Sequence, residues 1–211
     1  MPLFYQQNIN ATTRLAVWLI AEDESFFLQK VPLQRNITHP NKRLQHLAGR
    51  YLLQHLFTDF PYDEIVIADT RKPYLPNEQY HFSISHCGSY AAAIASKDAR
   101  VGIDVELPTE RLYTISKKFL GATELQQFNV AANERNTAQQ QLLTTLWSAK
   151  EAIFKWWSYG SVDFSEQIQI EHFELLNQGN FTGSFIKDAQ RFALQLHYKL
   201  FEEVCLVWLA S

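Results

Sequence analysis

The sequence predicts an α+β fold, and three observations support that prediction. Residues 41–57 and 139–157 repeat apolar side chains with the period of an amphipathic helix. Shorter aliphatic and aromatic runs, such as residues 81–96, are typical of strands joined by tight turns. Helices and antiparallel-looking strands occur together in residues 1–100 and again in residues 101–211, so we expect two similar halves with a cleft between them.

The first half is predicted to alternate strands with two helices. The acidic run E-D-E marks the start of a short helix, and the tract T-R-K-P-Y-L-P is expected to be extended because a residue before proline avoids helix. The two strands within residues 81–96 should meet at the turn H-C-G-S. The remaining elements are a strand at residues 14–21, a helix at 41–57 and a short strand at 65–68.

The second half is predicted to begin with a strand, continue with two helices and end in a run of strands. The helix at residues 139–157 is the longest periodic segment in the chain. The predicted elements are a strand at residues 101–106, helices at 112–129 and 139–157, and strands at 167–172, 181–186, 192–198 and 205–209.

Composition narrows the class of protein. The chain has 211 residues, of which 46% are hydrophobic and 14% aromatic, enough for a sizeable core. A formal charge of −3 argues against a globally basic nucleic-acid binder. The two cysteines, Cys87 and Cys205, are too far apart for a zinc motif, and no apolar stretch approaches the ~20 residues of a membrane span. We therefore expect a soluble cytoplasmic protein without a signal peptide, a nucleic-acid partner or a membrane partner.

The stretch V-G-I-D-V-E, residues 101–106, places two carboxylates one residue apart in an apolar strand. Side chains alternate along a strand, so Asp104 and Glu106 share one face, which we expect to line the cleft. Two carboxylates that close repel each other unless a cation, a proton or a basic group lies between them. A solvated strand edge is the alternative interpretation.

The stretch W-S-A-K-E-A-I-F-K, residues 147–155, places a third carboxylate beside a lysine. Glu151 and Lys155 are one helical turn apart, whereas Lys150 points in a different direction. Alone, this pattern is typical of a surface ion pair. Together with Asp104 and Glu106 it predicts a hard-oxygen site for Mg²⁺ with a cation at its side, and Mg²⁺ sites of that kind usually take a phosphate substrate.

Basic residues in the first half could bind such a phosphate, although no P-loop and no G-x-G-x-x-G occurs. Arg43 and Arg50 are seven residues apart on one helix, with His46 nearby. Ser85 and His86 end a strand before a turn. Together with Arg71 and Lys72 before Pro73, they predict a basic wall opposite the acidic one.

The ordered combination of these motifs resembles the 4′-phosphopantetheinyl transferases, in their larger monomeric class that activates peptide and polyketide synthases. R-K-P-Y-L-P is similar to that class's G-K-P-x-x-P, with Arg71 in place of glycine. F-S-I-S-H-C-G is similar to F-N-I-S-H-S-G, with Ser83 and Cys87 as the departures. K-R-L-Q-H-L-A-G-R and F-L-G-A-T-E extend the resemblance over most of the chain.

The resemblance implies two α+β halves related by a pseudo-twofold axis, with coenzyme A between them. The implied reaction transfers the phosphopantetheine arm to a serine of an apo acyl, peptidyl or polyketide carrier protein and releases adenosine 3′,5′-bisphosphate. Asp104, Glu106 and Glu151 would hold Mg²⁺, and Lys155 would neutralise the transferred phosphoryl group. The coenzyme A-binding residues would be Arg43, Arg50, Lys72, Pro73, Ser85 and His86.

Several roles stay open at this point. The general base could be Glu151 or a metal-bound water. Glu124 could reach the site through water or act only as a helix-start acid. A non-catalytic module of the same fold and a Mg²⁺-dependent phosphohydrolase are the competing functions. Lys117 and Lys118 could steer an acidic carrier protein, or only form a solvated helix face. Cys87 is expected to be a turn residue and Cys205 a core residue.

Overall fold

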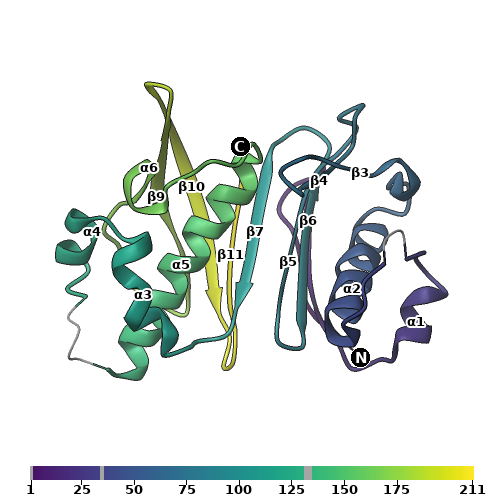
Figure 1. Ribbon diagram of the computed structural model, residues 1–211, viewed down its shortest axis with the longest axis horizontal. Coiled ribbons are helices and arrows are strands. Elements are labelled where there is room, and N and C mark those ends of the chain that lie inside the picture. The colour runs from purple at the N-terminus through teal and green to yellow at the C-terminus, as the bar shows by residue number, and fades with distance from the viewer. Residues whose placement is uncertain (1, 34–35, 131–134) are drawn as a thin grey trace.

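The computed structural model describes residues 2–33, 36–130 and 135–211, and in it two antiparallel sheets stand side by side (Figure 1). The first sheet has the order β1-β2-β6-β5 and the second the order β7-β11-β10-β9-β8. A separate ribbon pairs β3 with β4. The strands are β1 Leu3–Asn8, β2 Thr13–Leu19, β3 Val66–Ile67, β4 Pro73–Tyr74, β5 His81–Cys87, β6 Tyr90–Ser96, β7 Val101–Glu106, β8 Ile168–Ile170, β9 Gln178–Lys187, β10 Gln190–Leu200 and β11 Cys205–Ala210.

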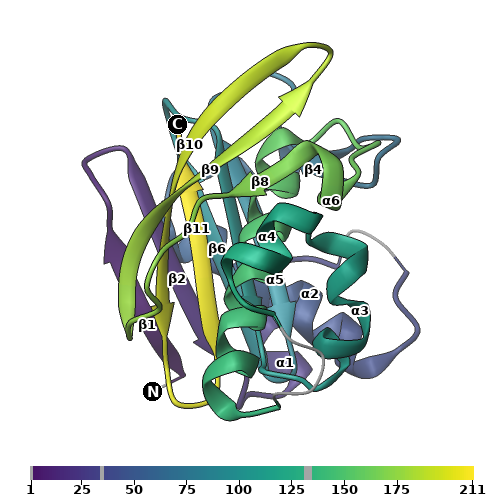
Figure 2. The same cartoon turned by 90° about the vertical axis from the view of Figure 1, so that its left-hand side faces the viewer.

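One long helix packs on each sheet, α2 on the first and α5 on the second, and the shorter helices lie around them (Figures 1 and 2). The predicted α+β class is therefore confirmed, and the first sheet ends before the second begins at Val101. The helices are α1 Glu24–Leu28, α2 Pro40–Leu56, α3 Arg111–Phe119, α4 Ala122–Gln127, α5 Thr137–Trp157 and α6 Phe164–Gln167, with a 3₁₀ turn at Tyr62–Glu64.

The structure differs from the sequence prediction in several elements, because the short helix α6 and the 3₁₀ turn were not predicted, an edge strand is added and one helix is divided. The edge strand β1 was not predicted, because its L-F-Y-Q-Q-N pattern is half polar and it pairs only with β2. The predicted helix 112–129 is two helices, α3 and α4. The chain turns at Gly121, where a Cβ would lie 2.8 Å from the Ser165 carbonyl oxygen. Glu124 then starts α4 by accepting a hydrogen bond from the Gly121 N–H (2.9 Å).

Three apolar clusters form the core. One lies beneath α2, one beneath α5, and the third joins the two sheets. Ile103 and Val105 belong to the third cluster and pack against residues of the first sheet such as Val17 and Ile94. The seam between the halves is therefore filled with apolar side chains from both.

The opposite face of β7 is covered by α5, and on it Gly102 and Asp104 are buried whereas Glu106 is partly exposed. A Cβ on Gly102 would lie 2.0 Å from the Ala152 carbonyl oxygen of α5, so only glycine allows helix and strand to come this close. Asp104 is 2% exposed as a result. Among the helices in the described residues, none is long and apolar enough to cross a membrane.

Candidate active site

Strand β7 and helix α5 together hold the acidic residues that the two motifs predicted. Asp104 and Glu106 leave β7 on the face that α5 covers, and Glu151 and Lys155 lie one turn apart on α5. Asn136 caps α5 by accepting a hydrogen bond from the Gln139 N–H (2.9 Å). The two motifs therefore lie on adjacent elements, and Lys155 of one contacts Asp104 of the other.

Asp104 is the centre of a three-residue contact. Its Oδ1 accepts a hydrogen bond from the Lys155 ammonium at 2.5 Å and from the Ser85 hydroxyl at 2.7 Å. Lys155 Nζ also lies 2.8 Å from Ser85 Oγ. The other oxygen, Asp104 Oδ2, is buried and has no hydrogen-bond partner in the part of the chain that the structure describes. A buried carboxylate oxygen without a partner is costly, so it indicates a place for a further cation or donor.

Burial and the charge of Asp104 both disfavour the ionised forms of the neighbouring acids Glu106 and Glu151. Burial raises the pKa of Glu151 to about 7, and the charges of Asp104 and Glu106 add to the increase. Burial and the charge of Asp104 also raise the pKa of Glu106, although Trp147 Nε1 donates a hydrogen bond to it (3.3 Å). A divalent cation among the three carboxylates would offset both the burial and the repulsion.

The donor set fits a hard cation, but the three carboxylates are not gathered around a common point. Across residues 2–33, 36–130 and 135–211, no three His, Cys, Asp or Glu side chains come close enough together to hold a metal ion. The Lys155 ammonium is instead the cation that neutralises Asp104. The carboxylates suit Mg²⁺ by their chemistry and by the unsatisfied Asp104 Oδ2.

A basic cavity of about 370 Å³ lies in the first half, beside β5. We call it the basic pocket, and its basic lining residues are Lys42, His46, Arg50, Arg71, Lys72 and His86. Arg50 is only 3% exposed and its guanidinium carbon lies 5.9 Å from the centre of the Tyr62 ring. The structure thus brings together four of the six residues predicted to bind coenzyme A, namely Arg50, Lys72, Pro73 and His86.

Two predicted basic-wall residues lie elsewhere. Arg43 Nε donates to Glu24 at 2.7 Å and its Nη1 to the Ile37 carbonyl at 2.9 Å, and Arg43 does not line the pocket. Ser85 belongs to the contact with Asp104. The sequence reasoning missed Lys42, which lies one turn from His46 and two turns from Arg50. That spacing of four was the signal for a shared helix face.

Lys72 links the two halves. Its ammonium donates hydrogen bonds to the carbonyl oxygen of Lys155 and to the hydroxyl of Ser158, at the carboxyl end of α5. A helix leaves its last carbonyls unsatisfied, and a cation there also complements the helix dipole. Burial, followed by the charges of Arg100 and Lys155, lowers the pKa of Lys72 to about 8.

Lys150 points in a different direction from Lys155, as predicted, and forms a buried ion pair with Glu124. Lys150 is fully buried, and its ammonium donates to Glu124 Oε2 (2.6 Å) and to the carbonyls of Phe164 (2.8 Å) and Ile168 (2.7 Å). Glu124 Oε1 accepts from the Ile170 N–H (2.9 Å). The pair joins α4, α6 and β8 to α5. Of the two roles considered for Glu124, the structure shows the helix-start acid.

The two cysteines carry no sign of nucleophilic chemistry. Cys87 ends β5, and burial raises the pKa of its thiol to about 11. Cys205 is a core residue, as predicted, and burial raises its pKa to about 12. A thiol with a raised pKa is protonated at neutral pH and is a poor nucleophile.

Known proteins resemble the second half of the chain and, in longer matches, just under two thirds of it. Residues 100–207 match the model of the 4′-phosphopantetheinyl transferase superfamily, a stretch that contains Asp104, Glu106, Glu151 and Lys155. The chain is 27% identical over 146 residues to 4′-phosphopantetheinyl transferase AcpT of Escherichia coli O157:H7, covering 64% of this chain and 72% of that protein. It is 33% identical over 140 residues to enterobactin synthase component D of Salmonella typhi, covering 63% of this chain and 53% of that protein.

Proposed function

The chain belongs to the 4′-phosphopantetheinyl transferase superfamily, and from that premise we propose how its own residues transfer the 4′-phosphopantetheine arm of coenzyme A to a carrier protein. The reaction forms a bond between a serine oxygen and the phosphorus of the arm. It breaks the pyrophosphate bond of coenzyme A and releases adenosine 3′,5′-bisphosphate. The observation that carries the proposal is the ion pair of Lys155 on α5 with the buried Asp104 on β7, with Glu151 and Glu106 on the same two elements.

We propose that Asp104, Glu106 and Glu151 hold Mg²⁺ at this site. The raised pKa values of Glu106 and Glu151 and the unpartnered Asp104 Oδ2 support the assignment, because burial and neighbouring negative charge raise both values and a cation bound there would offset both. When bound, the metal would supply positive charge to the pyrophosphate oxygens. Phosphoryl transfer depends mainly on such positioning and charge stabilisation.

Lys155 is the residue of this chain that we expect to contact the transferred phosphoryl group. Its ammonium is partly exposed and is held by Ser85 and Asp104, so a phosphate oxygen can replace one of these acceptors. Glu151, one helical turn from Lys155 on α5, is one candidate to accept the proton of the carrier serine. A metal-bound water is the other candidate for that step.

The basic pocket is proposed to bind the phosphates of the adenosine end of coenzyme A. It contains Lys42, Arg50, Arg71 and His86, and its wall includes Lys72 and Pro73. Guanidinium and ammonium groups form charge-assisted hydrogen bonds with phosphate oxygens. Lys42 takes the place that the sequence prediction gave to Arg43, whose guanidinium is bound to Glu24.

We further propose that the chain belongs to the larger monomeric class of the family, with functional halves 1–100 and 101–211. The R-K-P-Y-L-P tract and the F-S-I-S-H-C-G strand support this class, and each half has its own sheet and long helix. One relative carries the name enterobactin synthase component D, which favours a carrier domain of a synthetase as the acceptor.

Mass spectrometry of an apo carrier protein tests this function directly. The carrier protein is incubated with this chain, coenzyme A and Mg²⁺, and we expect a mass gain equal to the phosphopantetheine arm. The gain should vanish with EDTA and with Asp104→Asn, and it should persist with Asp188→Asn, an exposed acid on the turn after β9. Transfer that survives EDTA and Asp104→Asn would contradict the metal assignment. An unmodified carrier together with binding of coenzyme A would indicate a non-catalytic module.

A further inference from the structure

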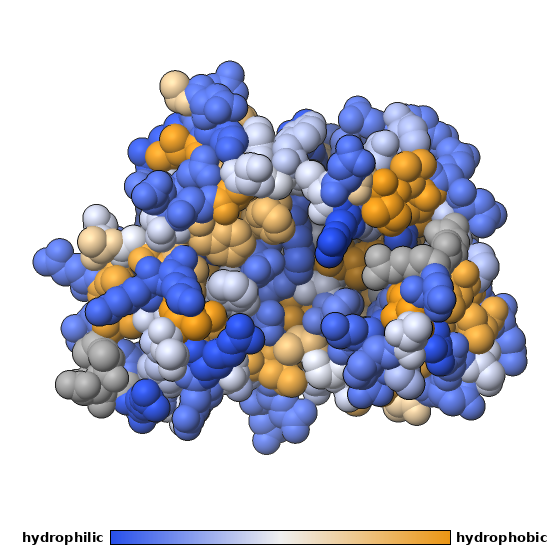
Figure 3. All heavy atoms as spheres, viewed as in Figure 1, coloured by the Kyte–Doolittle hydropathy of each residue, from blue (hydrophilic) through white to orange (hydrophobic). Residues whose placement is uncertain are grey.

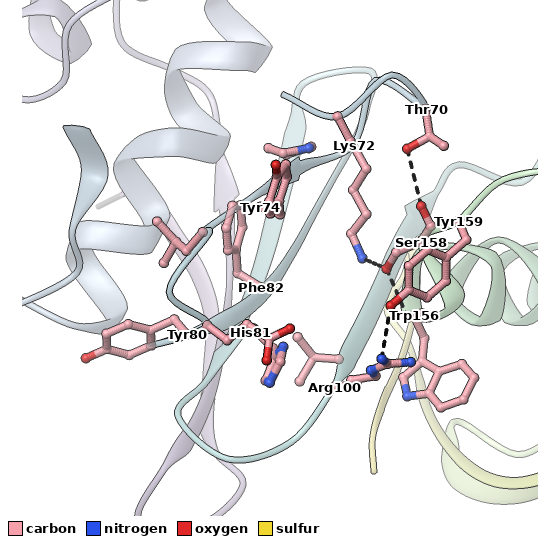
Figure 4. Close-up of a pocket in the computed structure, with 15 residues that line it drawn as sticks. Thr70, Lys72, Tyr74, Tyr80, His81, Phe82, Arg100, Trp156, Ser158 and Tyr159 are labelled. Carbon is pink, nitrogen blue, oxygen red and sulfur yellow. Dashed lines mark hydrogen bonds between the residues drawn. The ribbon is translucent and has the colours of Figure 1, made fainter. Parts of the chain in front are cut away.

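A second cavity, of about 280 Å³, lies between the two halves on the other side of Lys72 (Figure 4). We call it the seam pocket, and its walls come from the β3–β4 ribbon, the starts of β5 and β7, and the end of α5. It shares Lys72, Pro73 and Phe82 with the basic pocket. Arg50, Ser85 and His86 do not line it. The two cavities therefore lie on opposite sides of one wall.

Most of the seam pocket is apolar, and several of its lining side chains are buried. Leu75, Phe82, Val101 and Trp156 line it, and each is at most 5% exposed. Tyr74, at the rim, is 43% exposed. A preformed apolar cavity of this size suits the body of a small organic molecule, because cavities for drug-sized ligands begin at roughly 300 Å³.

The polar groups of the seam pocket are mainly donors. The indole N–H of Trp156 is buried and has no hydrogen-bond partner in the described part of the chain, and in the view of Figure 4 it is turned toward Arg100. Arg100 is exposed at the rim and donates to the Tyr159 hydroxyl at 3.1 Å. A buried donor without a partner indicates an acceptor that binds there.

The charges around the seam pocket favour an anion. Lys72 and Arg100 are both positive, and Glu78 is the acidic lining residue. Burial lowers the pKa of His81, so this side chain adds no positive charge at neutral pH. The charge of Arg100 contributes to the lowered pKa of Lys72, so the two cations repel each other. An anionic group between them would offset that repulsion and accept from Trp156.

We propose that the seam pocket binds a small aromatic carboxylate at a site distinct from that of coenzyme A. The aromatic ring lies among Phe82, Val101 and Trp156, and the carboxylate accepts hydrogen bonds from the Trp156 indole and from Arg100. Lys72 connects this site to α5, since its ammonium holds the Lys155 carbonyl. An anion in the seam pocket thus contacts the helix that bears Glu151 and Lys155.

The test compares 3-phenylpropionate with the matched neutral alcohol 3-phenylpropanol by NMR of the ¹⁵N-labelled full chain at pH 7, where Lys72 is charged. The chain has five tryptophans, so the Trp156 indole signal can be assigned with Trp156→Phe. We expect the acid to shift that signal saturably and to bind about tenfold more tightly than the alcohol, the factor that one charge-assisted hydrogen bond supplies at its lower bound. Saturating coenzyme A should leave this binding in place.

Two arginine variants separate the pockets. Arg100→Gln should remove the preference for the acid, and Arg71→Gln, which changes the basic pocket, should retain it. Equal affinity for acid and alcohol, or an unshifted Trp156 signal, would overturn the proposal. Displacement of the acid by coenzyme A would also overturn it, because the seam pocket would then be part of the coenzyme A site.

Discussion

Replacing Lys155 with methionine should strengthen the binding of divalent metal to the chain when no coenzyme A is present. The Lys155 ammonium lies 2.5 Å from Asp104 Oδ1, on the carboxylate that the proposed metal site needs. A metal ion that binds at Asp104 without coenzyme A must share this carboxylate with the ammonium or displace it, and the two positive charges repel each other. Methionine keeps the length of the side chain and removes the competing cation.

The size of the effect follows from the contact between Lys155 and Asp104 that a metal at this carboxylate weakens or replaces. A hydrogen bond to a charged group contributes about 1.5–3 kcal/mol, and each 1.4 kcal/mol corresponds to about tenfold in a dissociation constant. The side chain of Lys155 is 23% exposed and that of Asp104 is 3% exposed, so screening by water is modest. Lys155→Met should therefore bind Mn²⁺ or Mg²⁺ about 10- to 100-fold more tightly than the unaltered chain.

Calorimetric titration and the electron paramagnetic resonance of free Mn²⁺ measure this affinity without any turnover. The measurements should be made at pH 8, because Glu151 has a pKa of about 7 without metal and is ionised at that pH. Because Lys155→Met leaves Asp104 as a buried charge, its fold is checked by circular dichroism. Lys155→Gln, which removes the charge and keeps a donor, is the second variant if the first is unstable.

Lys72→Met is the matched control for long-range charge. It also removes a lysine near α5, but the Lys72 ammonium is bound to the Lys155 carbonyl and to Ser158 and not to Asp104. We expect a much smaller change in metal affinity for this variant. An equal gain in both variants, or no gain in Lys155→Met and Lys155→Gln, would refute the idea that Lys155 competes with the metal for Asp104.

Three further predictions concern stability. Lys150→Met should lower the free energy of unfolding, measured in urea, by about 3–5 kcal/mol, because it leaves Glu124 as an unpaired buried charge. Lys118 is exposed, so Lys118→Met should change this free energy little. In EDTA, the free energy of unfolding should fall as the pH rises from 4.5, the ordinary pKa of this carboxyl group, to about 7, its pKa in the folded chain. In this range the folded chain keeps the Glu151 proton that the unfolded chain releases, so Glu151→Gln should flatten the slope. A slope unchanged in this variant would assign the titration to another group. Gly102→Ala should lower both stability and transfer, because its Cβ would force β7 away from α5; normal values for both would show that the gap can widen freely.

Much of the active site could be predicted from the sequence because its residues lie on regular elements. The alternation in V-G-I-D-V-E predicted the strand Val101–Glu106 with its observed bounds. The one-turn spacing of Glu151 and Lys155 placed both on the helix face that meets β7. Such local periodicities depend only on backbone geometry, so they hold without knowledge of the partner elements.

Tertiary structure alone decided which residues face one another across the molecule. Helical phase allowed either Arg43 or Lys42 to accompany Arg50, and the ion pair of Arg43 with Glu24 of α1 made the choice. In the sequence, Lys150 cannot be told from a surface lysine. The structure shows it bound to Glu124 and to the carbonyls of two other segments. A side chain's partner depends on how distant segments pack, and one sequence carries no direct record of that packing.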